Sequence, residues 1–447
     1  MLSVSAAIIV TKMKDANDDI GTQVGKQLLD NPKPLLISSG ILFMLGVIPG
    51  MPNVPFLLLA VVAFAAAMFL IQKKQQEQLQ TVPDVPVPET AETSEPKELS
   101  WDDVQPVDII GLEVGYRLIP MVDKAQGGQL MNRIKGIRRK LSQELGFLVQ
   151  SVHIRDNLDL SPNAYRITLN GVPMGDAEIH PERDLAINPG KVFGEIQGVK
   201  TRDPAFGLDA VWIEPSQRDN AQAQGYTVVD AGTVVATHLS EVIKHHAGEL
   251  LGHEEVQQLL DSLANNYPKL VEDLVPKTIS LSQVLKVLQS LLSEGISIKD
   301  IRTIAETLAD QAVINQDPAN LLSAVRVALS RSIVQQLVGN IEEIPVVVLD
   351  ANLEQLLQQS MQASGGEGFG FEPGLAERLQ QALIETSKEQ EMSGQETILL
   401  VAAGIRSWMS KFARHSAQGI HVLSYNEIPD NRKIKVVATI GEAGSGA

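Results

Sequence analysis

The chain has 447 residues, a formal net charge of −17 and no cysteine. Its acidic balance opposes sequence-independent binding to nucleic acid, because such binding needs a basic surface that displaces counterions from the phosphates. The missing cysteines exclude disulfides, thiolate metal sites and cysteine nucleophiles. We therefore expect proteins, and no nucleic acid, as partners.

Residues 1–33 are predicted to be the end of a preceding membrane segment and its cytoplasmic connection. Residues 1–10 are apolar and lysines follow them, which is the reverse of the order in a secretory signal peptide. A chain that starts inside an apolar stretch is typical of a fragment of a longer protein.

A transmembrane helical hairpin is predicted over residues 34–72. Two apolar runs, 35–48 and 54–71, contain no ionisable side chain and are joined by a turn with proline and glycine. Because a charged group at mid-bilayer costs about 2.5 kcal/mol or more, its absence from both runs favours insertion. Lysines flank the hairpin and are absent from its turn, which predicts that both ends are cytoplasmic. The first run is shorter than the roughly 20 residues of a spanning helix, so a soluble core hairpin and a partly re-entrant pair are the alternatives.

Residues 73–108 are predicted to be an acidic, proline-rich linker. Between residues 81 and 106 the chain carries five prolines and seven acidic side chains against one lysine. Such a composition forms no packed core and behaves as a semi-extended tether. Trp101 has two interpretations that are equally favoured: it docks the end of the linker onto a neighbouring surface, or it packs on its own domain.

An α/β domain is predicted from two separate stretches, 109–181 and 231–250. Asn170-Gly171 lies between two segments that alternate apolar and polar residues, which predicts a tight hairpin. The helix expected at 231–250 has the apolar face that this sheet needs, so residues 182–230 are predicted to form an inserted subdomain. The other expected elements are a strand leading into a turn at 112–122, an amphipathic helix at 127–145 with Leu130, Ile134, Ile137 and Leu141 on its apolar face, and a strand at 146–157.

A helical bundle is predicted at 251–338 and a C-terminal α/β domain at 339–447. In the bundle, Ser280 and Ser297 precede apolar runs with helical spacing and are the expected N-caps. In the C-terminal domain, buried strands at 345–350, 397–402, 419–425 and 433–440 are expected to alternate with helices near 351–362, 374–391 and 404–415. The predicted fold class is therefore a membrane helical hairpin plus a multidomain α/β and α-helical cytoplasmic region.

The residues that could carry chemistry form one weak candidate metal cluster. His246, Glu249 and His253 are spaced so that they could share a helix face, with His245 and Glu254 beside them. The HExxH pattern is missing, and histidines near a helix C-terminus are favoured by the helix dipole without any metal. A P-loop and a GxSxG elbow are missing as well. We therefore predict no metal, no cofactor and no enzymatic activity.

Several strings and the order of the predicted parts resemble one protein family. The strings are VGKQLLDNPKPLL, GYRLIPMVD, RDPAFGLDAVWI, TVVATHLSEVI, LVEDLVPK, IRTIAETLAD and LSYNEIPDNRKIKVVATI. Together they resemble the C-terminal two-thirds of the export-gate family of flagellar type III protein secretion, over essentially the whole chain. The membrane part that precedes this region in the family is missing here, so no proton-channel function is predicted.

The resemblance implies a location and a set of partners. The location is the bacterial inner membrane, with several membrane passes and a large C-terminal domain in the cytoplasm. The implied assembly is a nine-membered ring in which the helical bundle supplies much of the subunit contact. The implied partners are flagellar export chaperones with late substrates, the export ATPase complex and the other export-gate proteins.

The resemblance also implies a chaperone-binding site in a dimple between the α/β domain and its insert, at Asp203, Phe206 and Thr237. A phenylalanine in a turn beside proline and glycine can stand exposed as an anchor for a partner. The residues alone favour another interpretation, in which Phe206 is core and Asp203 is a turn residue. If the family interpretation holds, alanine at Asp203 or Phe206 weakens chaperone binding and leaves the melting temperature nearly unchanged.

Two other functions compete with the flagellar export gate. The nearest is the homologous gate protein of a virulence injectisome, which RDPAFGLDAVWI and YNEIPDNRKIKVVATI resemble less closely. The remote alternative is a membrane-anchored metal enzyme that uses the histidine cluster.

Overall fold

The computed structural model describes residues 107–123, 128–363, 373–416 and 419–441, together with Leu58, Leu59, Phe64 and Met68. The chain divides into two compact units, residues 1–101 and 102–447. In the predicted hairpin only those four residues are described, and each has helical backbone. The remainder of the hairpin, the segment before it and the linker with Trp101 lie outside the described residues.

The first sheet of the second unit has the strand order β2-β1-β3-β4, with β1 and β2 parallel and the other pairs antiparallel. The hairpin predicted at Asn170-Gly171 is confirmed: both residues have positive φ, 49° and 79°, as a tight two-residue turn requires. The predicted strand at 146–157 is wrong in its first half, because the pairing starts only at Val152. The bounds are β1 (Ile110–Val114), β2 (Val152–Asp156), β3 (Ala164–Leu169) and β4 (Val172–Glu178).

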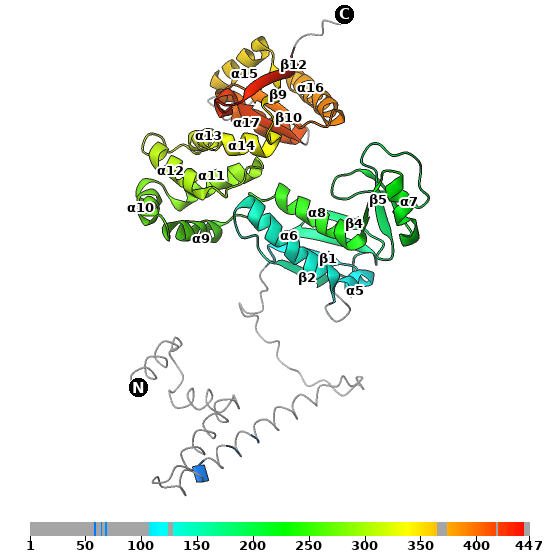
Figure 1. Cartoon of the computed structure of the whole chain (residues 1–447). Helices are drawn as coiled ribbons and strands as arrows, with labels where there is room; N and C mark the ends of the chain where they lie inside the picture. The colour runs from blue at the N-terminus through cyan, green and yellow to red at the C-terminus, as the bar shows by residue number, and fades with distance from the viewer. Residues whose placement is uncertain are drawn as a thin grey trace, which may run out of the picture. The chain divides into compact units, whose positions relative to one another are not determined.

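Two helices, α6 (Gln129–Leu145) and α8 (Ala231–His245), pack side by side on this sheet (Figure 1). Alternate strand residues such as Leu112 and Ile167 are buried beneath them. The expected apolar face of α6 is confirmed, with Leu130, Ile134 and Leu141 buried and Ile137 packed at the edge of the same core. The short helices η2 (Tyr116–Leu118) and α5 (Ile119–Val122) follow β1, where a turn was expected.

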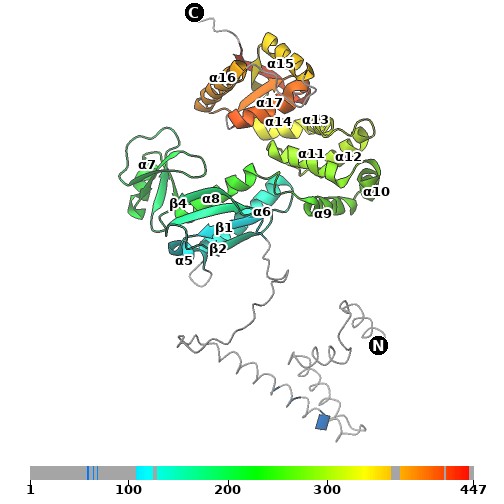
Figure 2. The ribbon, with the colours of Figure 1, turned by 180° about the vertical axis from the view of Figure 1, so that it is seen from behind.

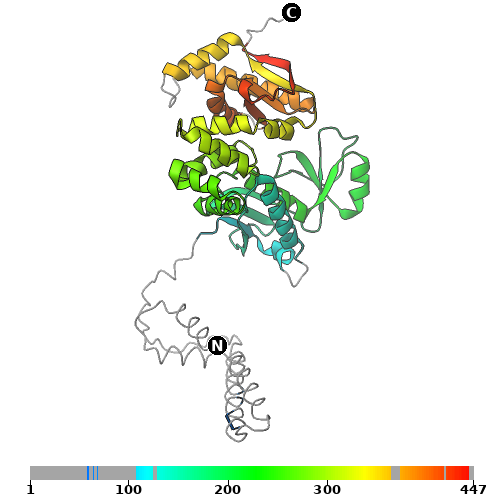
Figure 3. The ribbon, with the colours of Figure 1, turned by 60° about the vertical axis from the view of Figure 1, so that its left-hand side comes forward.

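The stretch predicted as an insert, drawn in green, has a sheet of its own (Figure 3). Its strand order is β6-β7-β5-β8, and every pair is antiparallel. One face contributes Trp212 and Ala210 to the main core, and the other covers a small core around Ile213 and Val228. The last strand runs directly into α8, whose N-cap Asp230 accepts from the Thr233 backbone N–H at 2.9 Å. The bounds are β5 (Asp184–Ile187), β6 (Val199–Arg202), β7 (Asp209–Ile213), η4 (Pro215–Gln217), α7 (Arg218–Ala223) and β8 (Thr227–Asp230).

The region predicted as a bundle is helical in the structure (Figure 2). Ser280 is confirmed as an N-cap, since its hydroxyl accepts from the Gln283 backbone N–H and the Gln283 side chain returns a bond to Ser280. The bounds are α9 (His253–Ala264), α10 (Pro268–Glu272), η5 (Asp273–Thr278), α11 (Leu281–Ser293), α12 (Ile301–Ala312), α13 (Pro318–Ala328) and α14 (Ser330–Val338).

The predicted N-cap Ser297 is wrong. The cap of α12 is Asp300, whose carboxylate accepts from the Thr303 backbone N–H at 3.1 Å. Ser297 instead donates to the Glu144 backbone oxygen at 2.6 Å and so ties this loop to the end of α6. An N-cap must directly precede the first helical turn, and Asp300 holds that place.

The C-terminal sheet is parallel, in the order β11-β10-β9-β12. Its residues alternate between two cores: Ile344 and Leu400 face the core shared with the helical region, whereas Val347 and Val401 face α15, α16 and α17. Burial on both faces explains why these strands read as continuous apolar runs. The bounds are β9 (Glu343–Leu349), α15 (Ala351–Ala363), α16 (Pro373–Met392), β10 (Thr397–Val401), α17 (Ala403–Ser416), β11 (Ile420–Ser424), η6 (Tyr425–Glu427) and β12 (Lys433–Ile440).

Within the part of the chain that the structure describes, no single helix combines the length and the apolar character of a membrane span. The helices α13 and α14, which are bent by 67° relative to one another, reach that length and apolar character only when they are taken together.

Candidate functional site

The candidate site is built on the turn that connects β6 to β7. The Asp203 backbone pairs with both Gly207 and Leu208 at 2.8 Å, and one Asp203 carboxylate oxygen accepts from the Phe206 backbone N–H, also at 2.8 Å. Gly207 has φ +68°, which a glycine adopts without strain. Two backbone hydrogen bonds and the Asp203 carboxylate therefore hold the turn together.

Burial differs sharply between the two predicted residues of this turn. Asp203 is 3% exposed, whereas Phe206 is 59% exposed. The interpretation of Phe206 as core is wrong, and that of Asp203 as a turn residue is confirmed. Because Asp203 is buried and already bonded to its own turn, its carboxylate supports the anchor and is poorly placed to face a partner.

Thr237, the third predicted residue, is half-buried on α8, and its neighbour His238 is buried. The Nδ1 atom of His238 lies 2.8 Å from the Tyr165 hydroxyl oxygen of β3, and the two rings meet edge to face with centroids 5.7 Å apart. Sequence reasoning missed both residues. The only local signal was a histidine on the apolar face of a helix, which by itself points to no partner.

The electrostatics of this pair link it to the Asp203 turn. Burial lowers the pKa of His238 below its usual value, against the opposing effect of the Asp203 and Asp176 carboxylates. Burial also raises the pKa of Tyr165, and the same two carboxylates add to that rise. His238 is therefore neutral and Tyr165 protonated at neutral pH. The Asp203 carboxylate is thus close enough to the pair to act electrostatically on both rings.

The histidine cluster does not assemble as the spacing suggested. The helix α8 ends at His245 and α9 starts at His253, so His246, Glu249 and His253 do not share one helix face. His246 pairs with Glu249 at 3.0 Å, but His253 bonds to Ser282 at 3.1 Å. Over the described ranges, no group of three or more histidine, aspartate and glutamate side chains could hold a metal ion.

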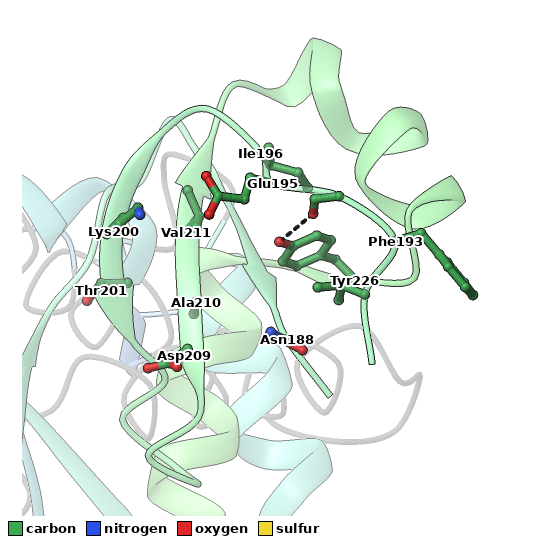
Figure 4. Close-up of a pocket in the computed structure, with 12 residues that line it drawn as sticks. Asn188, Phe193, Glu195, Ile196, Lys200, Thr201, Asp209, Ala210, Val211 and Tyr226 are labelled. Atoms are coloured by element: carbon green, nitrogen blue, oxygen red, sulfur yellow. Dashed lines mark hydrogen bonds between the residues drawn. The ribbon is translucent and has the colours of Figure 1, made fainter. Parts of the chain in front are cut away.

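A cavity of about 630 Å³ lies in the insert, on the β6–β7 hairpin that ends in the Asp203 turn (Figure 4). Its wall includes Tyr226, whose hydroxyl donates to the Gly194 backbone oxygen at 3.0 Å. The charged side chains of its lining, Glu195, Lys200 and Asp209, are exposed to solvent. Phe193 points away from the cavity and is 90% exposed. The cavity thus has a mixed, largely solvated lining without a buried acid or base.

A second set of residues that sequence reasoning missed is a buried ion cluster. Arg326 of α13 forms a two-bond pair with Glu427 of η6, at 3.0 and 2.5 Å, and also donates to Glu294 at 2.5 Å. Arg406 of α17 donates to the same Glu294 oxygen at 2.6 Å. These four side chains are between 0% and 7% exposed. Burial opposes the charge of Arg326, but the bonds and charges of Glu427 and Glu294 outweigh it and raise the pKa of Arg326.

Comparison with protein families matches residues 1–433 to the FHIPEP family. The chain belongs to this family. A similar FHIPEP relative is the flagellar biosynthesis protein FlhA of Escherichia coli strain K12, which is 48% identical over 442 residues. That match covers 99% of this chain and 62% of the relative, so the chain spans less than two thirds of the relative's length.

Two solved structures share the fold of this FHIPEP chain. The CdsV protein of Chlamydia pneumoniae superimposes with a TM-score of 0.65 at 25% identity, over 76% of this chain and 99% of CdsV. Nonameric SctV-C of EPEC gives a TM-score of 0.61 at 21% identity, over 75% of this chain and 99% of SctV-C. The multidomain α/β and α-helical part of the fold prediction is thereby confirmed.

Proposed function

We propose that this chain is an export-gate component of the flagellar type III secretion apparatus and docks chaperone–substrate complexes at Phe206 and Thr237. The family, and the identity of 48% to a flagellar biosynthesis protein, support the first half of the proposal. The observation that carries the second half is the exposed Phe206 on a turn held by the buried Asp203.

An exposed phenylalanine on a preorganised turn is a suitable anchor. Full burial of such a side chain by a partner is worth about 1.5 to 3 kcal/mol, and a rigid turn reduces the ordering cost of binding. Thr237, half-buried on α8, would supply a hydroxyl for a polar contact. The site therefore suits a partner with an apolar pocket and a polar edge, such as a folded chaperone.

The flagellar role is favoured over that of a virulence injectisome. The FlhA relative is 48% identical, whereas CdsV, with the same fold, is 25% identical. The histidine cluster of the metal-enzyme alternative is divided in the structure, since His246 pairs with Glu249 whereas His253 bonds to Ser282.

The chain is further proposed to be anchored in a membrane, to form a ring and to bind other proteins of the export apparatus. We propose that residues 34–72 anchor the chain in the bacterial inner membrane as part of a multi-pass protein, with residues 109–447 in the cytoplasm. A ring of subunits is proposed because SctV-C, which has this fold, is nonameric. The export ATPase complex and other export-gate proteins are proposed partners, and Trp101 is the proposed docking residue of the linker.

The test is chaperone binding by the full chain in detergent micelles, with a flagellar export chaperone loaded with its late substrate. We expect Phe206→Ala to weaken binding at least tenfold, because the lost burial is worth more than about 1.4 kcal/mol. The matched control is Phe193→Ala, which removes a second exposed phenylalanine of the same insert. Equal affinities of the two variants would refute the docking site.

A further inference from the structure

The last strand of the C-terminal sheet, β12, has one open side. In the sheet order β11-β10-β9-β12 it lies at the edge, and among the described strands it pairs only with β9 (red in Figure 1). An edge strand presents a row of unpaired backbone N–H and C=O groups, to which an extended segment of another chain can add as a further strand. The strand β12 therefore has the backbone groups that such an addition requires.

The hydrogen bonds between β9 and β12 show which residues offer these groups. The backbone N–H of Lys433 donates to the Glu342 backbone oxygen at 3.0 Å, so it points toward β9. Backbone groups alternate in direction along a strand, and those of Lys435 therefore point toward β9 as well. The backbone groups of Ile434 and Val436 point outward and form the open edge.

The side chains of these two edge residues are apolar and largely uncovered. Ile434 and Val436 lie in register with two residues of β9, Ile344 and Val346, and register partners point to the same face of a sheet. The two β9 side chains are fully buried in the core shared with the helical region, whereas Ile434 is 43% exposed and Val436 is 55% exposed. The apolar layer of this face thus continues to the edge and ends there without cover from the described residues.

The other face of β12 carries two exposed lysines, Lys433 and Lys435. In register they lie beside Glu343 and Pro345, and neither lysine forms an ion pair with a described residue. If two copies of β12 paired antiparallel through their open edges, lysines would lie opposite lysines, and like charges directly opposite are destabilising. The two lysines therefore oppose pairing with a second copy and favour a segment that has carboxylates at the matching positions.

A bulge limits the length of the open edge. One extra residue, Val437, interrupts the register between β9 and β12 before Ala438. Such a bulge bends and twists the strand, so the regular edge runs from Lys433 to Val436. The edge therefore suits a short segment, with about four residues paired to β12.

We propose that β12 is a docking edge for a short, extended segment of a protein partner in which acidic and apolar residues alternate. The segment adds antiparallel to β12, its apolar side chains cover Ile434 and Val436, and its carboxylates lie opposite Lys433 and Lys435. Main-chain hydrogen bonds supply the affinity, and the side chains on the two faces supply the specificity. This edge belongs to the C-terminal domain and is independent of the docking site proposed at Phe206.

The test uses the full chain in detergent micelles and the labelled hexapeptide Glu-Val-Glu-Val-Glu-Val, with binding measured by fluorescence anisotropy. The control peptide, Glu-Glu-Glu-Val-Val-Val, has the same composition and charge but no alternation. We expect the alternating peptide to bind at least about fivefold more tightly than the control peptide. Since both peptides and the chain are acidic, non-specific attraction adds little to either signal.

Two variants at Ile434 separate the backbone from the side chain. Ile434→Ala keeps the outward N–H, whereas Ile434→Pro removes it. Proline is tolerated on an edge strand where its missing N–H would face solvent, so both variants should have similar melting temperatures. We expect Ile434→Pro to bind the alternating peptide about tenfold more weakly than Ile434→Ala does.

Lys435→Glu tests the charge without touching the backbone. It replaces an exposed lysine and places a carboxylate opposite the carboxylates of the peptide. We expect it to weaken binding at least about tenfold at low salt, and added salt should reduce the difference from the wild type.

The outcomes distinguish this edge from the Phe206 site and from a contact between copies. Equal affinities of Ile434→Pro and Ile434→Ala, or wild-type affinity of Lys435→Glu, would overturn the docking edge. Phe206→Ala should bind the peptide as the wild type does, and a loss of binding in that variant would place the peptide at the insert and also overturn the edge. A lower oligomeric state of Ile434→Pro, with peptide affinity equal to that of Ile434→Ala, would assign the edge to a second copy of the chain and refute the proposal.

Discussion

At the scale of single residues, the structure separates two side chains that the sequence analysis treated alike. Both Asp203 and Phe206 were expected on a surface, where alanine changes binding and spares stability. Phe206 is indeed exposed, but Asp203 is buried and accepts a backbone hydrogen bond. The expectation that stability is nearly unchanged therefore stays a prediction for Phe206 and is revised for Asp203.

Replacement of Asp203 tests this revision. Asp203→Ala leaves the Phe206 backbone N–H without its acceptor, which costs about 1 to 3 kcal/mol when the group stays shielded from water. Asp203→Asn keeps an acceptor oxygen and should recover most of the loss. The melting temperature by differential scanning fluorimetry measures the effect, with Phe206→Ala as the exposed control. An unchanged melting temperature in Asp203→Ala would show that the turn does not depend on its carboxylate.

At the scale of elements, periodicity located most helices and strands to within a few residues. Helix α16 was expected at 374–391 and runs over Pro373–Met392, and the β10 strand was expected at 397–402 and runs over Thr397–Val401. The wrong cap at Ser297 has a local cause: a serine and an aspartate precede the same apolar run, and both residue types favour N-caps. Asp300 directly precedes the helix and caps it, whereas Ser297 bonds to Glu144, far away in the chain.

The caps can be tested one helix at a time. Ser280→Ala and Asp300→Ala should each destabilise the first turn of the helix that the residue caps by about 1 kcal/mol. Each variant loses the side-chain acceptor of a backbone N–H that has no partner within the helix. Amide hydrogen exchange at Gln283 and Thr303 reports this loss directly, and should rise in the matching variant only. Ser297→Ala is the control. If it accelerated exchange at Thr303 as much as Asp300→Ala does, the assignment of the cap would be wrong.

At the scale of the whole second unit, a charged cluster joins the helical region to the C-terminal sheet domain. Glu294 and Arg326 come from the helical region, and Arg406 and Glu427 from the last domain. Arg326 also donates to the Val422 backbone oxygen of β11 at 3.1 Å, so one side chain binds a carboxylate and a strand. Two domains that meet through apolar side chains alone can shift relative to one another at little cost. Buried charge pairs with directional hydrogen bonds favour a single arrangement of the helical region and the C-terminal domain.

Glu427→Gln should cost about 3 to 5 kcal/mol, because it leaves two buried guanidinium groups with a single carboxylate. The midpoint of urea unfolding measures the effect. The matched control is Glu306→Gln, which breaks the solvent-exposed pair of Arg302 and Glu306 at 2.8 Å and should leave the midpoint nearly unchanged. Similar costs for the two variants would mean that the buried cluster does not hold the domains together.

The sequence by itself determined the elements, their order, the resemblance to a family and the residues of the Phe206 turn. These features depend on contacts between residues a few positions apart, which periodicity, caps and turn residues record directly. Only the tertiary structure decided that Asp203 is buried and Phe206 exposed, that His238 meets Tyr165, and that Arg326 meets Glu427. The partners in the last two pairs lie 73 and 101 positions apart. Whether a polar side chain is solvated or buried depends on what the rest of the chain packs against it, and no local pattern encodes that.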